Sequence, residues 1–204
     1  MTRPVIVGLT GQSGAGKSTV SFIFVMNGYF VIDCDRLTHG LLVPGTECST
    51  ALEKRFPQFF DDGVLNRRKA APALFSDKAL LERYNSVIFP FITDEINRRI
   101  EAAFSAGKEY IMLDAPTLFE AGADKICDVI VSCIADTEVR LERITERDCI
   151  SREDALKRFA SQHDDAFFRE HSDYIIENNE DICTAEETAD RIAKEIKERQ
   201  NGKS

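Results

Sequence analysis

The sequence has no long apolar run, and no stretch approaches the roughly 18 apolar residues that cross a bilayer. No signal-peptide pattern precedes the first strand-like segment. We find no internal repeat and no low-complexity segment, and we expect only the tail, residues 200–204, to be frayed. These absences predict a chain that folds in the cytoplasm and has no membrane partner.

Positive charge is also scarce, because 26 Lys and Arg residues stand against 35 Asp and Glu residues, for a formal net charge of −9. Such a balance disfavours a general surface for nucleic acid or anionic lipid. The six cysteines contain no C-x-x-C pair and no Cys/His spacing suited to zinc. Reduced thiols in a cytosolic protein are the simplest interpretation. Any anion site must therefore concentrate its positive charge locally.

One short segment near the start concentrates glycine and ends in lysine: residues 8–20 read GLTGQSGAGKSTV. A β-branched run over residues 4–9 predicts a buried strand before it, and a helical pattern follows, ending at Gly28. Residues 11–18, here called the P-loop, fill every fixed position of G-x-x-x-x-G-K-[ST]. An ordinary flexible turn is the alternative, but the strand before and the helix after favour a loop that holds a nucleoside triphosphate.

The residue types of the P-loop fit that chemistry. Its glycines let backbone N–H groups converge on an anion, and the helix adds its positive N-terminal end. Lys17 reaches phosphate oxygens, and the Ser18 hydroxyl is a ligand for Mg²⁺. The expected ATP-binding residues here are Gly11, Gln12, Ser13, Gly14, Ala15, Gly16, Lys17, Ser18 and Thr19.

Strand-like runs recur at residues 4–9, 29–32, 109–113, 127–134 and 173–177, with helical patterns between them. This alternation predicts an α/β fold with a parallel sheet covered by helices on both faces. Residues 46–60, 66–74 and 77–105 read as helices, which is more chain than one crossover needs. We predict a single domain with its core at 1–45 and 106–204, and a helical insertion at about 46–105 where a second substrate docks.

Carboxylates follow two predicted strands, at the sheet edge where ligands of parallel sheets bind. The second strand runs into Asp33 and Asp35, and the third into Asp114. Phosphoryl transfer needs held Mg²⁺ and a group that takes the proton of the acceptor hydroxyl. Asp33 is the candidate catalytic base, and Asp35 the candidate helix N-cap, although either aspartate suits a cap. Asp114 equally fits a Mg²⁺ ligand or a turn before Pro116.

A row of arginines forms a second positive cluster. Arg140, Arg143 and Arg147 share one helical face and alternate with acidic residues. Spacing alone favours a solvated, salt-bridged face. The competing interpretation is a lid over ATP, at about residues 138–165, which rests on analogy with small P-loop kinases.

These motifs, in order along nearly the whole chain, resemble the dephospho-CoA kinase family. Besides the P-loop, the resemblance rests on Asp33-x-Asp35, on Asp114-x-Pro116-x-Leu118-Phe119-Glu120, and on Arg143-x-x-x-Arg147-Asp148 with Arg158 and Gln162. It also rests on Ser172–Asn179 and, in the insertion, on Gly63-x-Leu65-x-Arg67 and Phe75. The resemblance implies a P-loop kinase that transfers the γ-phosphoryl of ATP to the ribose 3′-hydroxyl of dephospho-CoA.

The resemblance also implies roles for single residues. Asp33 is then the base, Lys17 and Ser18 contact phosphate and Mg²⁺, and Arg143 and Arg147 bind ATP from the lid. The expected acceptor-binding residues are Asp33, Asp35, Arg67 and Phe89, and the expected metal ligands are Ser18 and Asp114. Two positions depart from the family's usual pattern. Phe89 stands where the family usually has His, and Glu180 where it usually has Gly.

Three other functions compete with this one. Another small P-loop kinase would phosphorylate a nucleoside, nucleotide or sugar, and acceptor identity depends on the insertion. A GTPase or ATP-driven switch would need an Asn-Lys-x-Asp segment, which the sequence lacks, and would leave Asp33 without a task. A binding protein with a dead site is disfavoured, because the P-loop, Asp33 and the arginines are all present. The sequence leaves the oligomeric state open.

Overall fold

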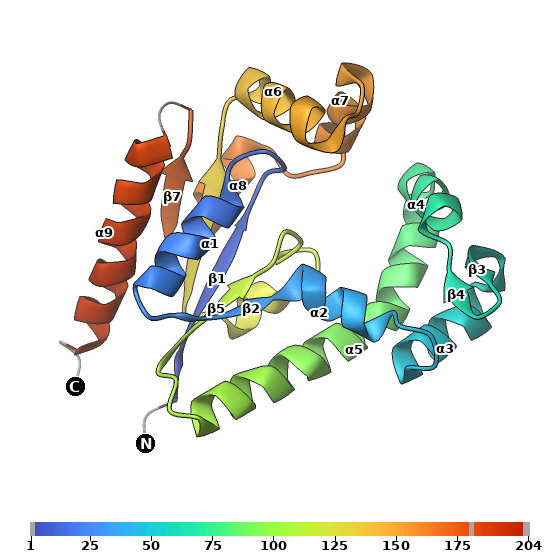
Figure 1. Cartoon of the computed structure of the whole chain (residues 1–204), viewed down its shortest axis with the longest axis horizontal. Coiled ribbons are helices and arrows are strands. Elements are labelled where there is room, and N and C mark those ends of the chain that lie inside the picture. Colours follow the sequence, from blue (N-terminus) through green and yellow to red (C-terminus); the bar gives the residue numbers. More distant parts are fainter. Residues whose placement is uncertain (1–2, 180–181, 202–204) are drawn as a thin grey trace. The chain divides into compact units, whose positions relative to one another are not determined.

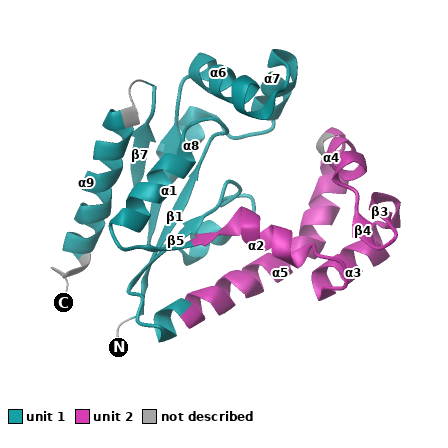
Figure 2. Ribbon diagram, in the orientation of Figure 1, with its two compact units in different colours: residues 1–31, 103–204 teal, residues 32–102 magenta. Residues whose placement is uncertain are grey.

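The computed structural model describes residues 3–179 and 182–201, and it divides into two compact units (Figure 2). Unit 1 comprises residues 1–31 and 103–204, and unit 2 comprises residues 32–102. The second unit therefore begins well before residue 46, where the sequence places the insertion. No helix in the described ranges has the length and hydropathy of a membrane span. The tail that is predicted to be frayed comprises residues 200–204. Residues 202–204 lie outside the described residues, and the side chains of residues 200 and 201 are not described either.

Unit 1 is built on a parallel sheet with strand order β2-β5-β1-β6-β7 (Figure 1). Its strands are β1 (Val5–Gly11), β5 (Tyr110–Asp114), β6 (Val129–Ile134) and β7 (Tyr174–Glu177), while β2 (Phe30–Asp33) passes from unit 1 into unit 2. Its helices are α1 (Lys17–Met26), α6 (Thr137–Asp148), α7 (Arg152–Ala160), α8 (Asp165–His171) and α9 (Ile182–Asn201), with a 3₁₀ turn, η2 (Ala123–Ile126). The predicted α/β class is confirmed, and each predicted strand lies within two residues of an observed one.

The central strand β1 shows why the sheet is covered on both faces. Successive strand residues point to opposite faces. Val7 and Leu9 belong to a core cluster with Phe24 of α1 and Ile192 of α9, so α1 and α9 cover one face. On the other face, a Cβ at Gly8 would lie 2.7 Å from the Leu118 side chain, in the segment after β5. That segment packs in turn on α8, which contacts β6 and β7.

Unit 2 has its own hydrophobic cluster, which contains Leu52, Phe56, Phe59, Tyr84 and Ile88. Its helices are α2 (Cys34–Leu41), α3 (Glu47–Arg55), α4 (Arg67–Ser76) and α5 (Lys78–Ser105), the last three residues of which belong to unit 1. It also contains the turn η1 (Pro57–Phe59) and the short strands β3 (Phe60–Asp61) and β4 (Val64–Leu65). The cap assigned to Asp35 implied a helix after it, but no bounds were predicted for α2.

The predicted helix over residues 46–60 is wrong beyond residue 55. Pro57 disfavours helical backbone at the residue before it, and Phe56 has φ −134° and ψ 54°. The chain then forms the hairpin β3–β4 around Asp62 and Gly63, which have φ values of 50° and 78°. An Asp-Gly pair is a strong hairpin signal because both central residues of a type I′ turn need positive φ.

Candidate active site

The P-loop connects the end of β1 to the start of α1, as the sequence predicts. At two of its positions the chain needs glycine, because the backbone has a positive φ and a neighbouring group lies too close for a Cβ atom. Gly11 has φ +142°, and a Cβ there would lie 2.2 Å from the Cys133 carbonyl oxygen. Gly16 has φ +91°, and its Cβ would lie 2.1 Å from Nδ2 of Asn178. Any side chain at either position would collide with β6 or with the end of β7.

Lys17, the first residue of α1, forms an ion pair with Asp114, the last residue of β5. The parallel register places Asp114 opposite Leu9 of β1, two residues before the P-loop begins. The two side chains are only 18% and 13% exposed. Opposite charges at this depth attract more strongly than at a fully hydrated surface. Asp114 thus holds the ammonium group of Lys17 beside the P-loop.

Asn178, directly after β7, supports the P-loop from the interior. It is 4% exposed, and its Nδ2 donates to the Ala15 carbonyl oxygen at 2.9 Å. The C=O and N–H of one trans peptide point in opposite directions. The contact therefore directs the N–H of Gly16 away from Asn178.

Arg143 of α6 also supports the P-loop. Its Nη1 donates to the Asn178 carbonyl oxygen at 2.9 Å and to the Gly14 carbonyl oxygen at 3.3 Å. A charged donor makes stronger hydrogen bonds than a neutral one. Arg143 is therefore part of the framework beneath the P-loop, which the sequence-based choice between a solvated face and a lid did not foresee.

The other two arginines of the row lie in different surroundings. Arg140 is buried, with its guanidinium 4.2 Å from the centroid of the Phe159 ring. Burial lowers the pKa of Arg140, and the nearby charge of Asp165 opposes that shift. Arg147 is 63% exposed on its side chain. The solvated-face interpretation is therefore wrong for Arg140 and Arg143, and it describes Arg147 alone.

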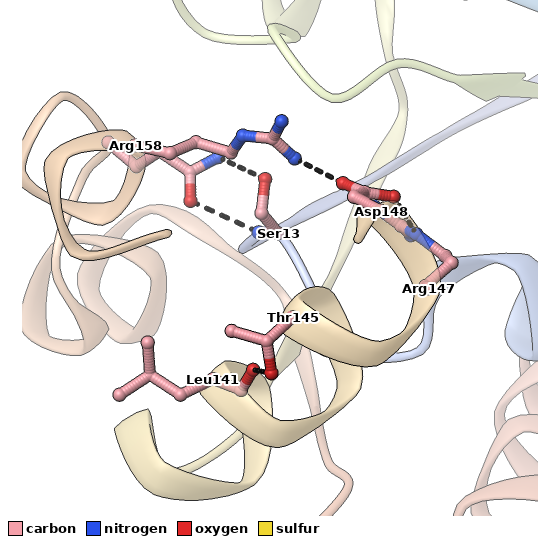
Figure 3. Close-up of polar contacts among 7 residues, drawn as sticks. Ser13, Leu141, Thr145, Arg147, Asp148 and Arg158 are labelled. Carbon is pink, nitrogen blue, oxygen red and sulfur yellow. Dashed lines mark hydrogen bonds and ion pairs between the residues drawn. The ribbon is translucent and has the colours of Figure 1, made fainter. Parts of the chain in front are cut away.

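Asp148, the last residue of α6, joins two arginines (Figure 3). Its Oδ1 accepts from Nε of Arg147 at 2.7 Å, and its Oδ2 accepts from Nη1 of Arg158 at 2.6 Å. These hydrogen bonds, that of Arg147 first, lower the pKa of Asp148 to about 2. The carboxylate therefore ties the end of α6 to the last turn of α7.

In unit 2, the N-cap of α2 is Asp33 rather than Asp35, which corrects the assignment made from the sequence. The Asp33 Oδ1 accepts a hydrogen bond from the Arg36 N–H at 2.8 Å. Asp35 lies in the first turn of α2. The cap falls to Asp33 because its backbone is still extended, with ψ 105°, where a side-chain oxygen reaches the N–H three residues on.

A cavity of about 280 Å³ lies within unit 2, lined by α2, α4 and α5. It brings together two predicted acceptor-side residues, Asp35 and Arg67. Nη1 of Arg67 is 2.8 Å from Nε2 of His39. Sequence reasoning missed four polar residues of the cavity lining, namely Thr38, His39, Tyr84 and Asn85. His39 lies four residues after Asp35, and this helical spacing was the available signal.

Three further positions that the sequence singled out are Phe89, Phe75 and Glu180. Phe89 is half-buried and packs against the hydrophobic cluster of unit 2, which includes Leu74 and Tyr84 of the cavity lining. The side chain of Phe75 and the departure at Glu180 lie outside the described residues.

Comparison with known proteins gives the relationship. A sequence profile described as dephospho-CoA kinase matches residues 5–184. The chain belongs to the dephospho-CoA kinase family. The family protein of Corynebacterium diphtheriae is 34% identical over 199 residues, covering 95% of this chain and 96% of that one.

Solved structures agree on the fold. A Thermus thermophilus protein has a TM-score of 0.83 at 28% identity, with 94% of this chain and 96% of that chain covered. The dephospho-CoA kinase of Campylobacter jejuni has a TM-score of 0.69 at 23% identity, over 96% of this chain and 98% of that one. The family fold is thus present along nearly the whole chain.

Proposed function

We propose that the P-loop of unit 1 holds ATP and that the cavity of unit 2 holds the acceptor, so that the chain performs the reaction of its family. That reaction is ATP-dependent phosphorylation of dephospho-CoA to coenzyme A, and the proposed acceptor atom is the ribose 3′-hydroxyl oxygen. The observation that carries the proposal is the P-loop itself, with Lys17 held by Asp114 and the loop backbone held by Asn178 and Arg143. Such a preorganised site for phosphate needs little rearrangement when the transition state forms.

Asp33 is proposed as the base. It takes the proton of the 3′-hydroxyl while the hydroxyl oxygen forms a bond to the γ-phosphorus. The bond between the γ-phosphorus and the β,γ-bridging oxygen breaks, and ADP leaves. The helix cap uses Oδ1 of Asp33, and the proposal assigns the proton to Oδ2. A carboxylate accepts several hydrogen bonds, so the two roles are compatible. Lys17 supplies positive charge to the phosphoryl oxygens as negative charge moves onto the leaving ADP.

The P-loop residues fit a Mg²⁺ ion carried by ATP. The hydroxyl of Ser18, exposed in the first turn of α1, and the carboxylate of Asp114 are oxygen ligands of the kind that Mg²⁺ takes. Among residues 3–179 and 182–201, no cluster of three or more His, Cys, Asp or Glu forms a ready metal cage. Mg²⁺ in kinases typically keeps one or two protein ligands and takes the rest from phosphate and water. When bound, the ion offsets the charge of the phosphates.

The unit 2 cavity suits an adenine nucleotide end with phosphate. Arg67 offers a charged, planar donor for phosphate, and His39 lies beside it. Leu65, Leu74 and Tyr84 offer apolar lining for a base. Phe89 supports this lining from its place in the same hydrophobic cluster. We propose that Asp35 orients the acceptor from α2.

Residues 138–165 are proposed as the lid of the ATP side, and Arg143 and Gln162 already hold this segment against the P-loop. In this proposal Arg147 reaches the phosphates from the exposed end of α6, while Arg143 acts from beneath the loop. ATP and dephospho-CoA are the proposed substrates, with no nucleic-acid or membrane partner. The cytoplasmic location stays a prediction.

The direct test is a panel of acceptors with purified protein, ATP and Mg²⁺, read as ADP release. Dephospho-CoA, adenosine, AMP, pantetheine and water separate the possible reactions. We expect ADP release with dephospho-CoA and only background with the others. Faster turnover with adenosine or AMP would replace this function with that of another small kinase.

A further inference from the structure

The connection between α7 and α8, residues 161–164, is joined to the P-loop by side-chain contacts on two consecutive loop residues. Oε1 of Gln162 accepts a hydrogen bond from the Ser13 N–H at 3.1 Å, and its Nε2 donates to the Ser13 Oγ at 3.0 Å. Figure 3 draws two dashed lines at Ser13, to a residue that carries no label there. Asp165, the first residue of α8, accepts from Nε2 of Gln12 at 2.7 Å. The carboxamide of Gln162 therefore bonds to both the backbone and the side chain of Ser13.

The connection is itself firmly held at both ends. The Ser161 N–H closes the last turn of α7 on the Arg158 carbonyl, and Asp164 caps α8 through the Phe167 N–H at 2.9 Å. Arg158, one turn before Gln162, is tied to Asp148 of α6. A side chain on such a segment loses little further freedom when it bonds to the P-loop, because its own backbone is already ordered.

We propose that Gln162 is a positioning residue for ATP binding: it fixes Ser13 in the conformation in which the P-loop receives phosphate. Gln162 is not assigned a contact with ATP. The proposal rests on the proposed role of the P-loop in holding ATP. Its physical basis is the glycine content of the loop, because Gly11, Gly14 and Gly16 give this segment more conformational freedom to lose on binding. Contacts that order the loop beforehand reduce that loss.

A different role for the same contact would be occlusion, with Oε1 of Gln162 standing where a phosphate oxygen binds. The geometry favours positioning. A group that blocks the phosphate position needs to bond only to the Ser13 N–H. Gln162 also donates to the Ser13 hydroxyl, so it fixes the orientation of both the backbone and the side chain of Ser13. The neighbouring Gln12 is 4% exposed and held by Asp165, so this part of the loop is anchored in the interior. The two roles predict opposite changes in ATP affinity.

The test is Gln162→Met, which keeps a long side chain and removes both hydrogen bonds. We expect the dissociation constant for ATP, measured by titration calorimetry, to rise by about tenfold to a hundredfold, the effect of losing one to two hydrogen bonds. The KM for dephospho-CoA and kcat at saturating ATP are expected to stay within about twofold. Gln58→Met, the same change at an exposed position in unit 2, is the matched control and is expected to bind ATP as the wild type does.

A thermodynamic cycle with Ser13→Ala distinguishes positioning from a general loss of structure. Ser13→Ala keeps the backbone N–H and removes the hydroxyl contact, so we expect a smaller rise in the ATP dissociation constant. In the Gln162→Met background the same change is expected to have no further effect, because its partner is already gone. Fully additive effects would show that the two residues act independently and would overturn the proposal.

Unchanged or tighter ATP binding by Gln162→Met would also overturn it, and tighter binding would indicate occlusion. Melting temperatures of all variants show whether each is folded. If Gln162→Met fails to fold, Ser13→Ala decides, since an unchanged ATP dissociation constant there contradicts the proposal. A wild type that binds ATP but does not phosphorylate dephospho-CoA would refute the proposed function and leave this comparison of ATP affinities intact.

Discussion

Lys17, the first residue of α1, and Asp114, the last residue of β5, form an ion pair beside the P-loop. Both side chains are mostly buried, yet neither is at the centre of the hydrophobic core. The pair holds the ammonium group of Lys17 at the end of β5. Under the role proposed for Lys17, binding of ATP replaces the Asp114 carboxylate with phosphate as the anionic partner of the lysine.

Replacing Lys17 with Met removes this charge and keeps a long side chain. We expect kcat to fall by roughly 10²–10³, the usual loss when one preorganised charge at a transition state is removed. Lys108→Met, at an exposed position before β5, is the control. Steady-state kinetics and circular dichroism provide the measurements. A folded Lys17→Met protein with near-normal turnover would contradict the assignment.

Two substitutions separate the observed role of Asp33 as the cap of α2 from its proposed role as the base. Asn is as good an N-cap as Asp, so Asp33→Asn is expected to keep the stability of α2 while turnover falls by roughly 10²–10⁴ through loss of the base. Asp33→Ala is expected to lose similar turnover and also about 1 kcal/mol of stability, because the cap is gone. Urea unfolding and kcat measure the two effects. Full activity of Asp33→Asn would leave Asp33 as a cap alone.

Arg143 and Arg147 are expected to respond differently, although they lie one turn apart on α6. Arg143→Gln is expected to lower the free energy of unfolding by about 1–3 kcal/mol, since charged hydrogen bonds to backbone carbonyls are lost. Arg147→Gln is expected to change stability by less than about 1 kcal/mol, as is typical of an exposed ion pair, and to lower kcat/KM for ATP. Denaturant unfolding of both variants, with ATP kinetics, tests this contrast. Equal losses of stability would contradict it.

The carboxylate of Asp148 makes stability depend on pH in a defined range. Its folded-state pKa of about 2 is below the ordinary aspartate value, so its contribution is present above about pH 4 and is lost as pH falls toward 2. We expect Asp148→Asn to be less stable than wild type at pH 6, with the difference shrinking between pH 4 and 2.

Glu95 also has a lowered pKa of about 2, through Arg98 and then Arg99, but it is present in both proteins and cancels in the difference. Urea unfolding at each pH gives the measurement. A constant difference between wild type and Asp148→Asn down to pH 2 would show that the ion pairs do not stabilise the fold.

Local signals in the sequence predicted the P-loop and the strands around it, because glycines, lysine and β-branched runs act over a few residues. The Asp-Gly pair at residues 62–63 carries an equally local signal, but it lies between the helices predicted over residues 46–60 and 66–74, and no hairpin was predicted there. The choice between Asp33 and Asp35 as cap turned on where the backbone first becomes helical, a boundary that sequence patterns locate only within a few residues.

The contacts that support the P-loop could not be predicted from local signals in the sequence. The common face of Arg140, Arg143 and Arg147 was predictable from helical spacing, but which neighbours that face meets depends on packing. Asn178 and Gln162 were recognised in the sequence as residues of the family's motifs, but no contact was predicted for either. Their contacts with the P-loop join positions more than 140 residues apart, which no local pattern encodes.

The contact between Asn178 and the Ala15 carbonyl has a consequence for the chain as it leaves the ribosome. A nascent chain that ends before residue 178 contains the whole phosphate motif but lacks the side chain that fills the space beside Gly16. The supported loop therefore forms only after residue 178 has been added to the chain. Fragments of this protein, or halves prepared for complementation, acquire the supported P-loop only when the segment after β7 again contacts Ala15.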